Sequence, residues 1–203
     1  MVQLFQQGGG FMWPILVCLV LGIAIGLAKM WTLWRAGINT RRFIERVRTA
    51  LKEGGTEAAL EVCENTRGPV ASIFHAGLMR AKEGIEFVEK AITNAGSIEM
   101  AFLEKGMIWL GFFIVVAPML GFTGTVWGMI VAFDSIKTAN DISPAVVAGG
   151  ISQALLTTLF GLIVAMIVQF FYNWATARID KLIIDMEEAS VQLVDTLIEF
   201  DKE

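Results

Sequence analysis

The residues that could do chemistry in the apolar part of this chain carry hydroxyl and amide groups. Thr125 lies in the stretch APMLGFTGTVWG, and Gln153, Thr157 and Thr158 lie in the later stretch GGISQALLTTLFG. These side chains donate and accept hydrogen bonds, but none of them changes its charge near neutral pH. They can contact water or an ion, or bond to a neighbouring helix, but they cannot hold a proton as a charge.

Small residues recur on one face of each stretch when the two stretches are placed on helices. Small side chains let helix backbones approach closely, and hydroxyl groups can form hydrogen bonds across such a contact. The pattern alone leaves open whether these faces serve packing only or also line a pore. The residues predicted to pack helices together or to face a partner are Gly121, Gly124, Gly128, Ala132, Gly150, Ala154, Gly161 and Ala165.

Both stretches lie within longer segments that have no charged side chains. None occurs between Lys105 and Asp134, or between Asp141 and Arg178. The sequence also has no GxxxxGK[ST] phosphate loop, no GxSxG or HExxH motif and no Cys/His cluster. We therefore expect no enzymatic activity, no metal and no cofactor. An ion gradient, worth about 2.3 kcal/mol per elementary charge per 100 mV, would have to supply any work.

The remaining candidates for chemistry are one histidine and two cysteines. His75 is the single histidine and stands alone in the loop between the first two apolar runs, and we expect it to be a surface or packing residue. Cys18 lies in an apolar run and Cys63 in a charged region, so a bilayer boundary would keep them too far apart for a disulfide.

The elements that must position the polar residues are membrane helices. Of the 203 residues, 55% are hydrophobic, and the mean hydropathy is +0.63. A span needs about 20 mostly apolar residues, and residues 11–34, 106–136 and 144–175 qualify. No Lys or Arg precedes the first span, so we expect a retained anchor rather than a cleaved signal peptide.

The distribution of basic residues predicts the topology. Of the 16 Lys and Arg residues, 11 lie within residues 35–105. By the positive-inside rule this loop and the tail, 176–203, are cytoplasmic, whereas residues 1–10 and the short turn 137–143 are external. The formal net charge of −4 and the lack of a basic patch argue against a nucleic-acid partner.

The predicted fold class is an all-α membrane protein whose long second and third helices extend into a cytoplasmic helical region. A helical stripe over residues 40–52 ends at Gly54-Gly55, and a further break is expected at Gly68-Pro69. Residues 86–105 are expected to run as one helix into the second span. The stripe of the tail predicts a continuation of the third helix, packed on the loop helices or on a neighbouring subunit.

Three longer stretches resemble a known family. APMLGFTGTVWGMIVAF, with Pro118 and Trp127, resembles the second-helix signature of the TolQ/ExbB branch of the MotA/TolQ/ExbB proton-channel family. GGISQALLTTLFGLIVAMIVQFFYNW resembles its third-helix signature, which ends in a Tyr-Asn pair that includes Asn173. GPVASIFHAGLMRA resembles its cytoplasmic segment, so the resemblance covers most of the chain.

This resemblance implies an ion-driven stator subunit in a bacterial inner membrane. Members of the branch form homo-oligomers, namely pentamers, around a single-span partner of the ExbD/TolR type that carries a membrane aspartate. Ion flow then drives motion that passes to a TonB- or TolA-like protein. The transported ion is expected to be H⁺, although the residues themselves leave Na⁺ open.

The resemblance also implies roles for individual residues. Thr125 and Thr158 are expected to face the pore, and Thr157 would add a second hydroxyl there. Members of the branch often carry glutamate where this chain has Gln153, so the partner's aspartate would be the sole carboxylate at depth. The alternative is a non-conducting scaffold that assembles other membrane proteins, which spans without acids also fit.

Overall fold

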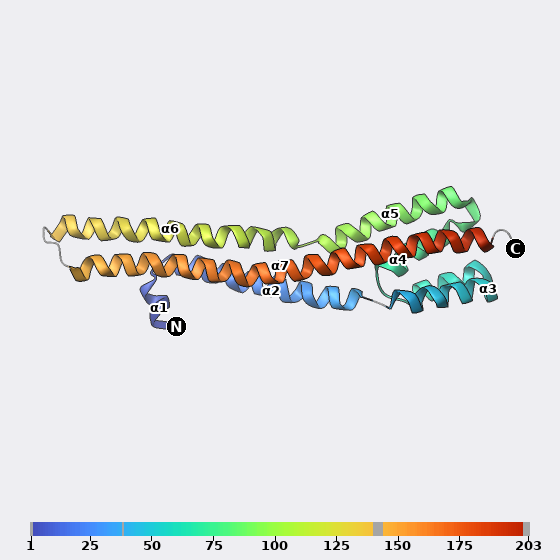
Figure 1. Ribbon diagram of the computed structural model, residues 1–203, viewed down its shortest axis with the longest axis horizontal. Coiled ribbons are helices and arrows are strands. Elements are labelled where there is room, and N and C mark those ends of the chain that lie inside the picture. The colour runs from blue at the N-terminus through green and yellow to red at the C-terminus, as the bar shows by residue number, and fades with distance from the viewer. Residues whose placement is uncertain (1, 38, 140–143, 201–203) are drawn as a thin grey trace. The chain divides into compact units, whose positions relative to one another are not determined.

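The computed structural model describes residues 2–37, 39–139 and 144–200, and the elements found there are all helical (Figure 1). The predicted all-α class is confirmed, and three of the described helices are long and apolar enough to cross a membrane. The elements are α1 (Val2–Gln7), α2 (Met12–Ala36), α3 (Thr40–Glu64), α4 (Pro69–Met79), the 3₁₀ helix η1 (Ala81–Glu83), α5 (Ile85–Glu104), α6 (Met107–Ala139) and α7 (Pro144–Phe200). Residues 140–143 of the predicted external turn and 201–203 of the predicted tail lie outside the described residues.

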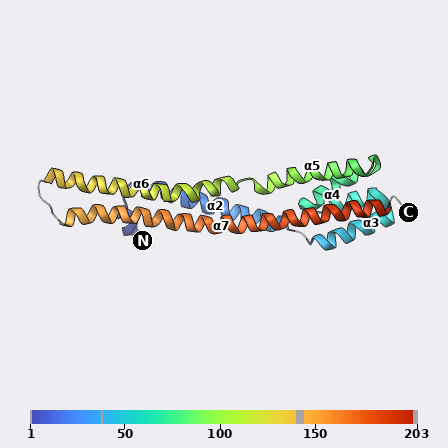
Figure 2. The ribbon, with the colours of Figure 1, turned by 45° about the horizontal axis from the view of Figure 1, so that its top comes forward.

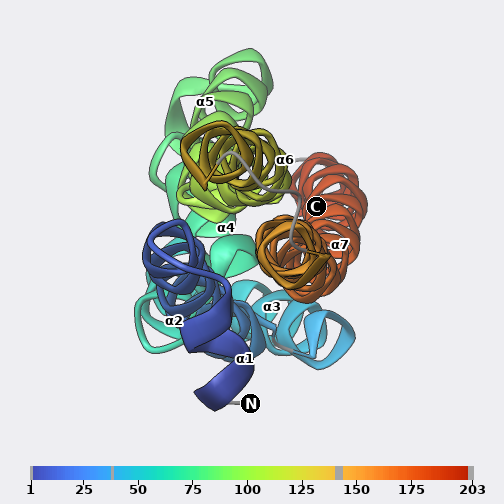
Figure 3. The same ribbon diagram turned by 90° about the vertical axis from the view of Figure 1, so that its left-hand side faces the viewer.

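The described residues form two compact units. The span unit comprises Met1–Lys29 and Gly106–Trp174, and the loop-and-tail unit comprises Met30–Lys105 and Ala175–Glu203. In the span unit, α6 runs antiparallel to the first part of α7, and α2 lies alongside α7 (Figures 1 and 2). Figure 3, which views the helices nearly end-on, shows α2, α6 and α7 as three neighbouring rods.

The core of the span unit joins all three of these helices. Its buried residues are Ile15, Cys18, Leu110, Phe113, Ala117, Val164 and Val168. Glycines on α2 make room for large side chains of α7. A Cβ atom on Gly22 would lie 2.5 Å from the side chain of Val168, and one on Gly26 would lie 2.6 Å from that of Phe171. The small face of α2 therefore fixes how close α7 can approach.

The outer surface of the span unit is strongly apolar. Exposed large side chains include Trp13, Phe122, Ile130, Leu155 and Phe170. A soluble monomer rarely exposes contiguous apolar surface on this scale. Lipid, or further protein within the membrane, is the environment that stabilises such a surface.

In the loop-and-tail unit, α3 has two arms. Gly55 adopts φ 71° and ψ −163°, which interrupts the helical backbone, as the Gly54-Gly55 pair predicted. The first arm buries Phe43, Val47 and Leu51, which are spaced by four residues and so share one face. The second arm buries Ala59 and Cys63.

Helix α4 begins at Pro69, where the predicted break occurs because Gly68 adopts φ 136°. Its buried Phe74 meets Phe43 of α3, with ring centroids 5.2 Å apart. A Cβ atom on Gly77 would lie 2.9 Å from Ile92 of α5 and 3.0 Å from Leu193 of α7. The tail thus packs on helices of its own loop, which is one of the two arrangements that the sequence left open.

One expectation about the backbone was wrong. Residues 86–105 do not continue as a single helix into the second span, because α5 ends at Glu104 and α6 begins at Met107. Lys105 has φ −52° and ψ 124°, and Gly106 has φ 92°. The positive φ at Gly106 is easily adopted only by glycine, and it ends the helix at that point.

We expect Phe74→Ala to lower the free energy of unfolding by about 3–5 kcal/mol, because it empties a site that is only 1% exposed beside Phe43. Phe87→Ala is the matched control, since Phe87 is 52% exposed, and we expect a change within about 0.5 kcal/mol. Denaturation of the detergent-solubilised chain, followed by circular dichroism, measures both. Equal losses for the two variants would contradict the core described here.

Candidate functional site

Small residues bring the backbones of α6 and α7 into direct contact. A Cβ atom on Gly121 would lie 2.9 Å from the carbonyl oxygen of Thr157, and one on Gly161 would lie 2.6 Å from that of Ala117. Further along, a Cβ atom on Gly128 would lie 3.0 Å from the carbonyl oxygen of Gly150. We call this contact the seam. Its small residues are Ala117, Gly121, Gly124, Gly128 and Ala132 on α6, and Gly150, Ala154, Thr157 and Gly161 on α7.

Two threonines, which we call the threonine pair, bond to each other across the seam. The hydroxyl groups of Thr125 and Thr158 are in mutual hydrogen-bond contact. Thr125 Oγ1 also lies 3.2 Å from the carbonyl oxygen of Gly121 and 3.3 Å from that of Ala154. Thr158 Oγ1 lies 3.2 Å from the carbonyl oxygen of Gly121. Four oxygen atoms therefore converge between the two helices.

The cluster contains two hydroxyl protons and four oxygen atoms that can accept a hydrogen bond, so the acceptors outnumber the protons. Each hydroxyl group donates a single hydrogen bond, yet each threonine oxygen lies within reach of the other hydroxyl and of at least one carbonyl oxygen. Both side chains are half-buried. A water molecule or ion at the exposed side of the pair would find oxygen acceptors already in place.

Thr157 has a different environment from its neighbour. Its side chain is 0% exposed, and its hydroxyl group donates to the carbonyl oxygen of Ala154 at 2.8 Å. A Cβ atom on Gly124 would lie 2.6 Å from Thr157 Oγ1. Thr157 thus lies inside the seam, enclosed between α6 and α7.

Gln153 turns away from the threonine pair. Its side-chain nitrogen lies against Gly9, where a Cβ atom would collide with it. Gly9 adopts φ 71°, so the chain turns between α1 and α2 at this point. The structure thus joins Thr125 and Thr158 and places Gln153 beside the N-terminal segment.

The remaining motif residues lie on the same two helices. Pro118 lies inside α6, which continues through it. The half-exposed ring of Trp127 lies 6.4 Å from that of Phe11. Asn173 accepts a hydrogen bond at 2.6 Å from Gln169. The four-residue spacing of these two amides was the signal that could have paired them.

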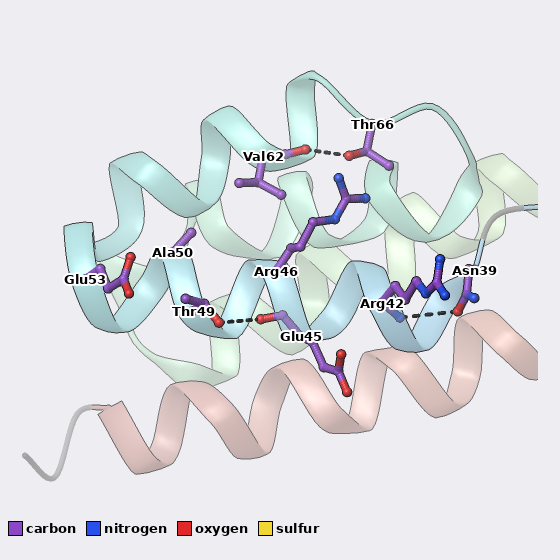
Figure 4. A pocket seen from close by; sticks show the side chains of 9 residues that line it. All are labelled: Asn39, Arg42, Glu45, Arg46, Thr49, Ala50, Glu53, Val62 and Thr66. Carbon is purple, nitrogen blue, oxygen red and sulfur yellow. Dashed lines mark hydrogen bonds between the residues drawn. The ribbon is translucent and has the colours of Figure 1, made fainter.

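Polar residues of the loop-and-tail unit form a groove of about 890 Å³ along α3 (Figure 4). Arg42 and Arg46 line it together with Glu45 and Glu53, so the charges of its wall are mixed. Thr49 and Thr66 turn their hydroxyl groups to carbonyl oxygens of their own helical turns. The groove therefore presents no concentrated charge or free hydroxyl that would define a ligand.

The other titratable candidates show no catalytic arrangement. His75 Nε2 lies 3.4 Å from a carboxylate oxygen of Glu64, which links α3 to α4. Among the residues that the structure describes, no group of three or more His, Cys, Asp and Glu side chains could hold a metal ion. Burial, and to a lesser degree the charge of Glu64, raises the pKa of the Cys63 thiol to about 12.

The part of the chain that matches known proteins includes α6 and most of α7. Residues 65–188 match the family model described as the MotA/TolQ/ExbB proton channel family. The chain is 32% identical over 180 residues to an ExbB homologue of Methanothermobacter thermautotrophicus, covering 88% of this chain and 64% of that protein. It is 30% identical over 190 residues to the biopolymer transport protein ExbB of Pseudomonas putida, covering 86% and 57%. It is 34% identical over 125 residues to the Tol-Pal system protein TolQ of Pseudomonas aeruginosa, covering 56% and 54%. The chain thus spans less than two thirds of the length of each of these relatives.

We expect Gly121→Ala to lower the free energy of unfolding by about 1–3 kcal/mol, because its methyl group meets backbone atoms of α7 that cannot rotate away. Gly111→Ala on the same helix is the control. Nothing lies within 4 Å of its added Cβ atom, and alanine favours a helix by about 0.5–1 kcal/mol over glycine. Denaturation in mixed micelles should move the two midpoints in opposite directions, and an unchanged midpoint for Gly121→Ala would refute the seam.

We expect iodoacetamide to leave Cys63 unmodified in the folded chain at pH 8. The thiol is buried, and pH 8 is well below its raised pKa, so the reactive thiolate is scarce. Peptide mass mapping with and without guanidinium measures the modification, and Ser72→Cys at an exposed position of α4 is the reactive control. Rapid alkylation of Cys63 without denaturant would contradict its burial.

Proposed function

The chain belongs to the MotA/TolQ/ExbB proton channel family, and from this premise we propose that it is a stator subunit driven by the proton-motive force. In this role it couples ion flow to mechanical work on the cell envelope, in TonB-type or Tol-type energisation. The names of its ExbB and TolQ relatives support these two systems. The family is a channel family rather than an enzyme family, so the proposal includes a transported ion, H⁺, and no catalysis or cofactor.

The observation that carries the proposal is the threonine pair. Thr125 and Thr158 place two hydroxyl oxygens and the carbonyl oxygens of Gly121 and Ala154 in one cluster, within segments that carry no charged residue. Such oxygens can replace part of the hydration of a passing ion or hold water in its path. The half-buried position of both threonines supports a role at the edge of a pore.

The composition of the spans supports a partner that supplies the carboxylate. The sequence has no charged residue between Lys105 and Asp134 or between Asp141 and Arg178. A proton path usually includes a group that titrates at depth. The proposal therefore places a homo-oligomeric ring, a pentamer by analogy with the TolQ/ExbB branch, around membrane helices of an ExbD/TolR-type protein with a membrane aspartate. A TonB- or TolA-like protein would receive the motion.

The three apolar helices, together with the ExbB and TolQ relatives, indicate a multi-pass protein of the bacterial inner membrane. We further propose that its N-terminus is periplasmic and its C-terminus cytoplasmic. The concentration of 11 of the 16 Lys and Arg residues in residues 35–105 supports this orientation.

One observation favours the second candidate, a non-conducting scaffold. Both threonine hydroxyls find acceptors within the chain, because the carbonyl oxygen of Gly121 lies 3.2 Å from each of them. Membrane-helix threonines often bond to such carbonyl oxygens and do nothing more. A test must therefore distinguish the loss of a hydroxyl group that only packs the helices from the loss of one that lines the ion path.

Thr158→Val removes the half-buried hydroxyl at nearly constant volume, and Thr157→Val does the same for the neighbour buried in the seam. We expect Thr158→Val to lower proton flux about tenfold, equivalent to about 1.4 kcal/mol of barrier. Thr157→Val should leave flux within about twofold. Liposomes that contain the complex purified through a tag on this chain measure flux, and native mass spectrometry checks its assembly.

Unchanged flux in an assembled Thr158→Val complex would favour the scaffold. Equal losses in both variants would assign the effect to helix packing instead of the path. Absence of flux in the unsubstituted complex would exclude conduction by that complex.

A further inference from the structure

A second polar feature lies within the apolar part of α7. Gln169 Nε2 donates a hydrogen bond to Asn173 Oδ1 at 2.6 Å. Asn173 is exposed and Gln169 is half-buried, while their neighbours Met166 and Phe170 expose 64% and 66% of their apolar side chains. We call Gln169 and Asn173 the amide pair. It is a small polar patch among exposed apolar side chains that are suited to contact with lipid.

The hydrogen bond within the amide pair leaves most of its donors and acceptors without a partner inside the pair. Two amide side chains hold four N–H donors and two carbonyl oxygens, and the bond between them uses only one donor and one oxygen. Amide groups without partners are strongly disfavoured in hydrocarbon. The side of α7 that carries them should therefore face water or polar protein groups rather than lipid tails.

The amide pair lies on the same side of α7 as Thr158. Gln169 follows Thr158 by eleven residues, which is close to three helical turns, and Asn173 follows one turn later. At about 1.5 Å per residue, Gln169 is about 16 Å further along the axis. The buried residues of α7 form a neighbouring row, since Val168 is buried and also follows the buried Thr157 by eleven residues.

Resting on the proposed function, we propose that the amide pair is a second hydrated station of the ion path, between the threonine pair and the cytoplasmic end of α7. Neutral amides do not bind the proton as a charge. They hold water and offer donors and acceptors, so water in the path would find hydrogen-bond partners again about 16 Å beyond Thr158. Leu162 and Ala165 occupy the turns between the two stations, which makes the intervening stretch apolar.

The competing explanation is a dry contact between the amide pair and a helix of another chain. Both explanations satisfy the amides, but only the hydrated station lets water-borne reagents reach them. Thiol accessibility in the assembled complex separates the two, and the buried native cysteines Cys18 and Cys63 can be replaced by alanine first.

The experiment introduces Thr158→Cys, Asn173→Cys or Phe170→Cys singly into this background, in native membranes that contain the complex. A membrane-impermeant cationic methanethiosulfonate and Ag⁺ are the probes, and mass spectrometry of the purified chain measures the modification rate. We expect Asn173→Cys to react at least tenfold faster than Phe170→Cys, and at a rate similar to that of Thr158→Cys. Native mass spectrometry checks that each variant assembles.

A rate for Asn173→Cys as low as that for Phe170→Cys, with Thr158→Cys reactive, would overturn the second station and leave the proposed function standing. If neither Thr158→Cys nor Asn173→Cys reacts, both proposals fail. As an independent readout, Gln169→Leu with Asn173→Leu should lower proton flux at least fivefold, whereas Phe170→Leu should not. Recovery of flux with Asn173→Gln would indicate that the amide chemistry, rather than side-chain shape, matters.

Discussion

The backbone contact between α6 and α7 is the constraint on which the candidate site depends. At Gly121 and Gly161 the helices approach so closely that a single added methyl group would collide with backbone atoms of the other helix. Only this separation lets the hydroxyl group of Thr125 reach both Thr158 and the carbonyl oxygen of Ala154. A larger residue in the seam would separate the four oxygens, so the packing glycines and the polar cluster form one structural unit.

The seam also explains why adjacent threonines have different surroundings. Consecutive residues on a helix are rotated by about 100°, so Thr157 can point into the α6 contact while Thr158 lies at its edge. Thr157 then satisfies its hydroxyl group within its own helix, through the carbonyl oxygen of Ala154. Thr158 reaches across to the other helix. A hydroxyl at the edge of a contact can exchange a protein acceptor for water, whereas one that is fully enclosed cannot.

Much of this arrangement could be predicted from local sequence. Helix breaks at Gly55 and Gly68, the small faces of the two spans and the apolar stripe of the tail follow from backbone freedom and periodicity. Two features could not be predicted in this way. The break at Gly106 depends on one residue adopting φ 92° between two stretches that both favour helix. The orientation of Gln153 depends on a distant segment at Gly9, whose position periodicity does not encode.

Within the span unit, two neighbouring rows of residues on α7 have different surroundings. One row, which includes Thr157, Gly161 and Val168, is buried against α6 and α2. The adjacent row carries Thr158 and Gln169 at the margin of the buried contact, and the exposed Asn173 follows one turn later. Because a rigid helix fixes the angle between the two rows, the packing that positions α7 also sets the direction in which its polar groups point. Neither row carries a charge between Asp141 and Arg178, so in the proposed function α7 would orient water or an ion while a partner chain would supply the titrating group.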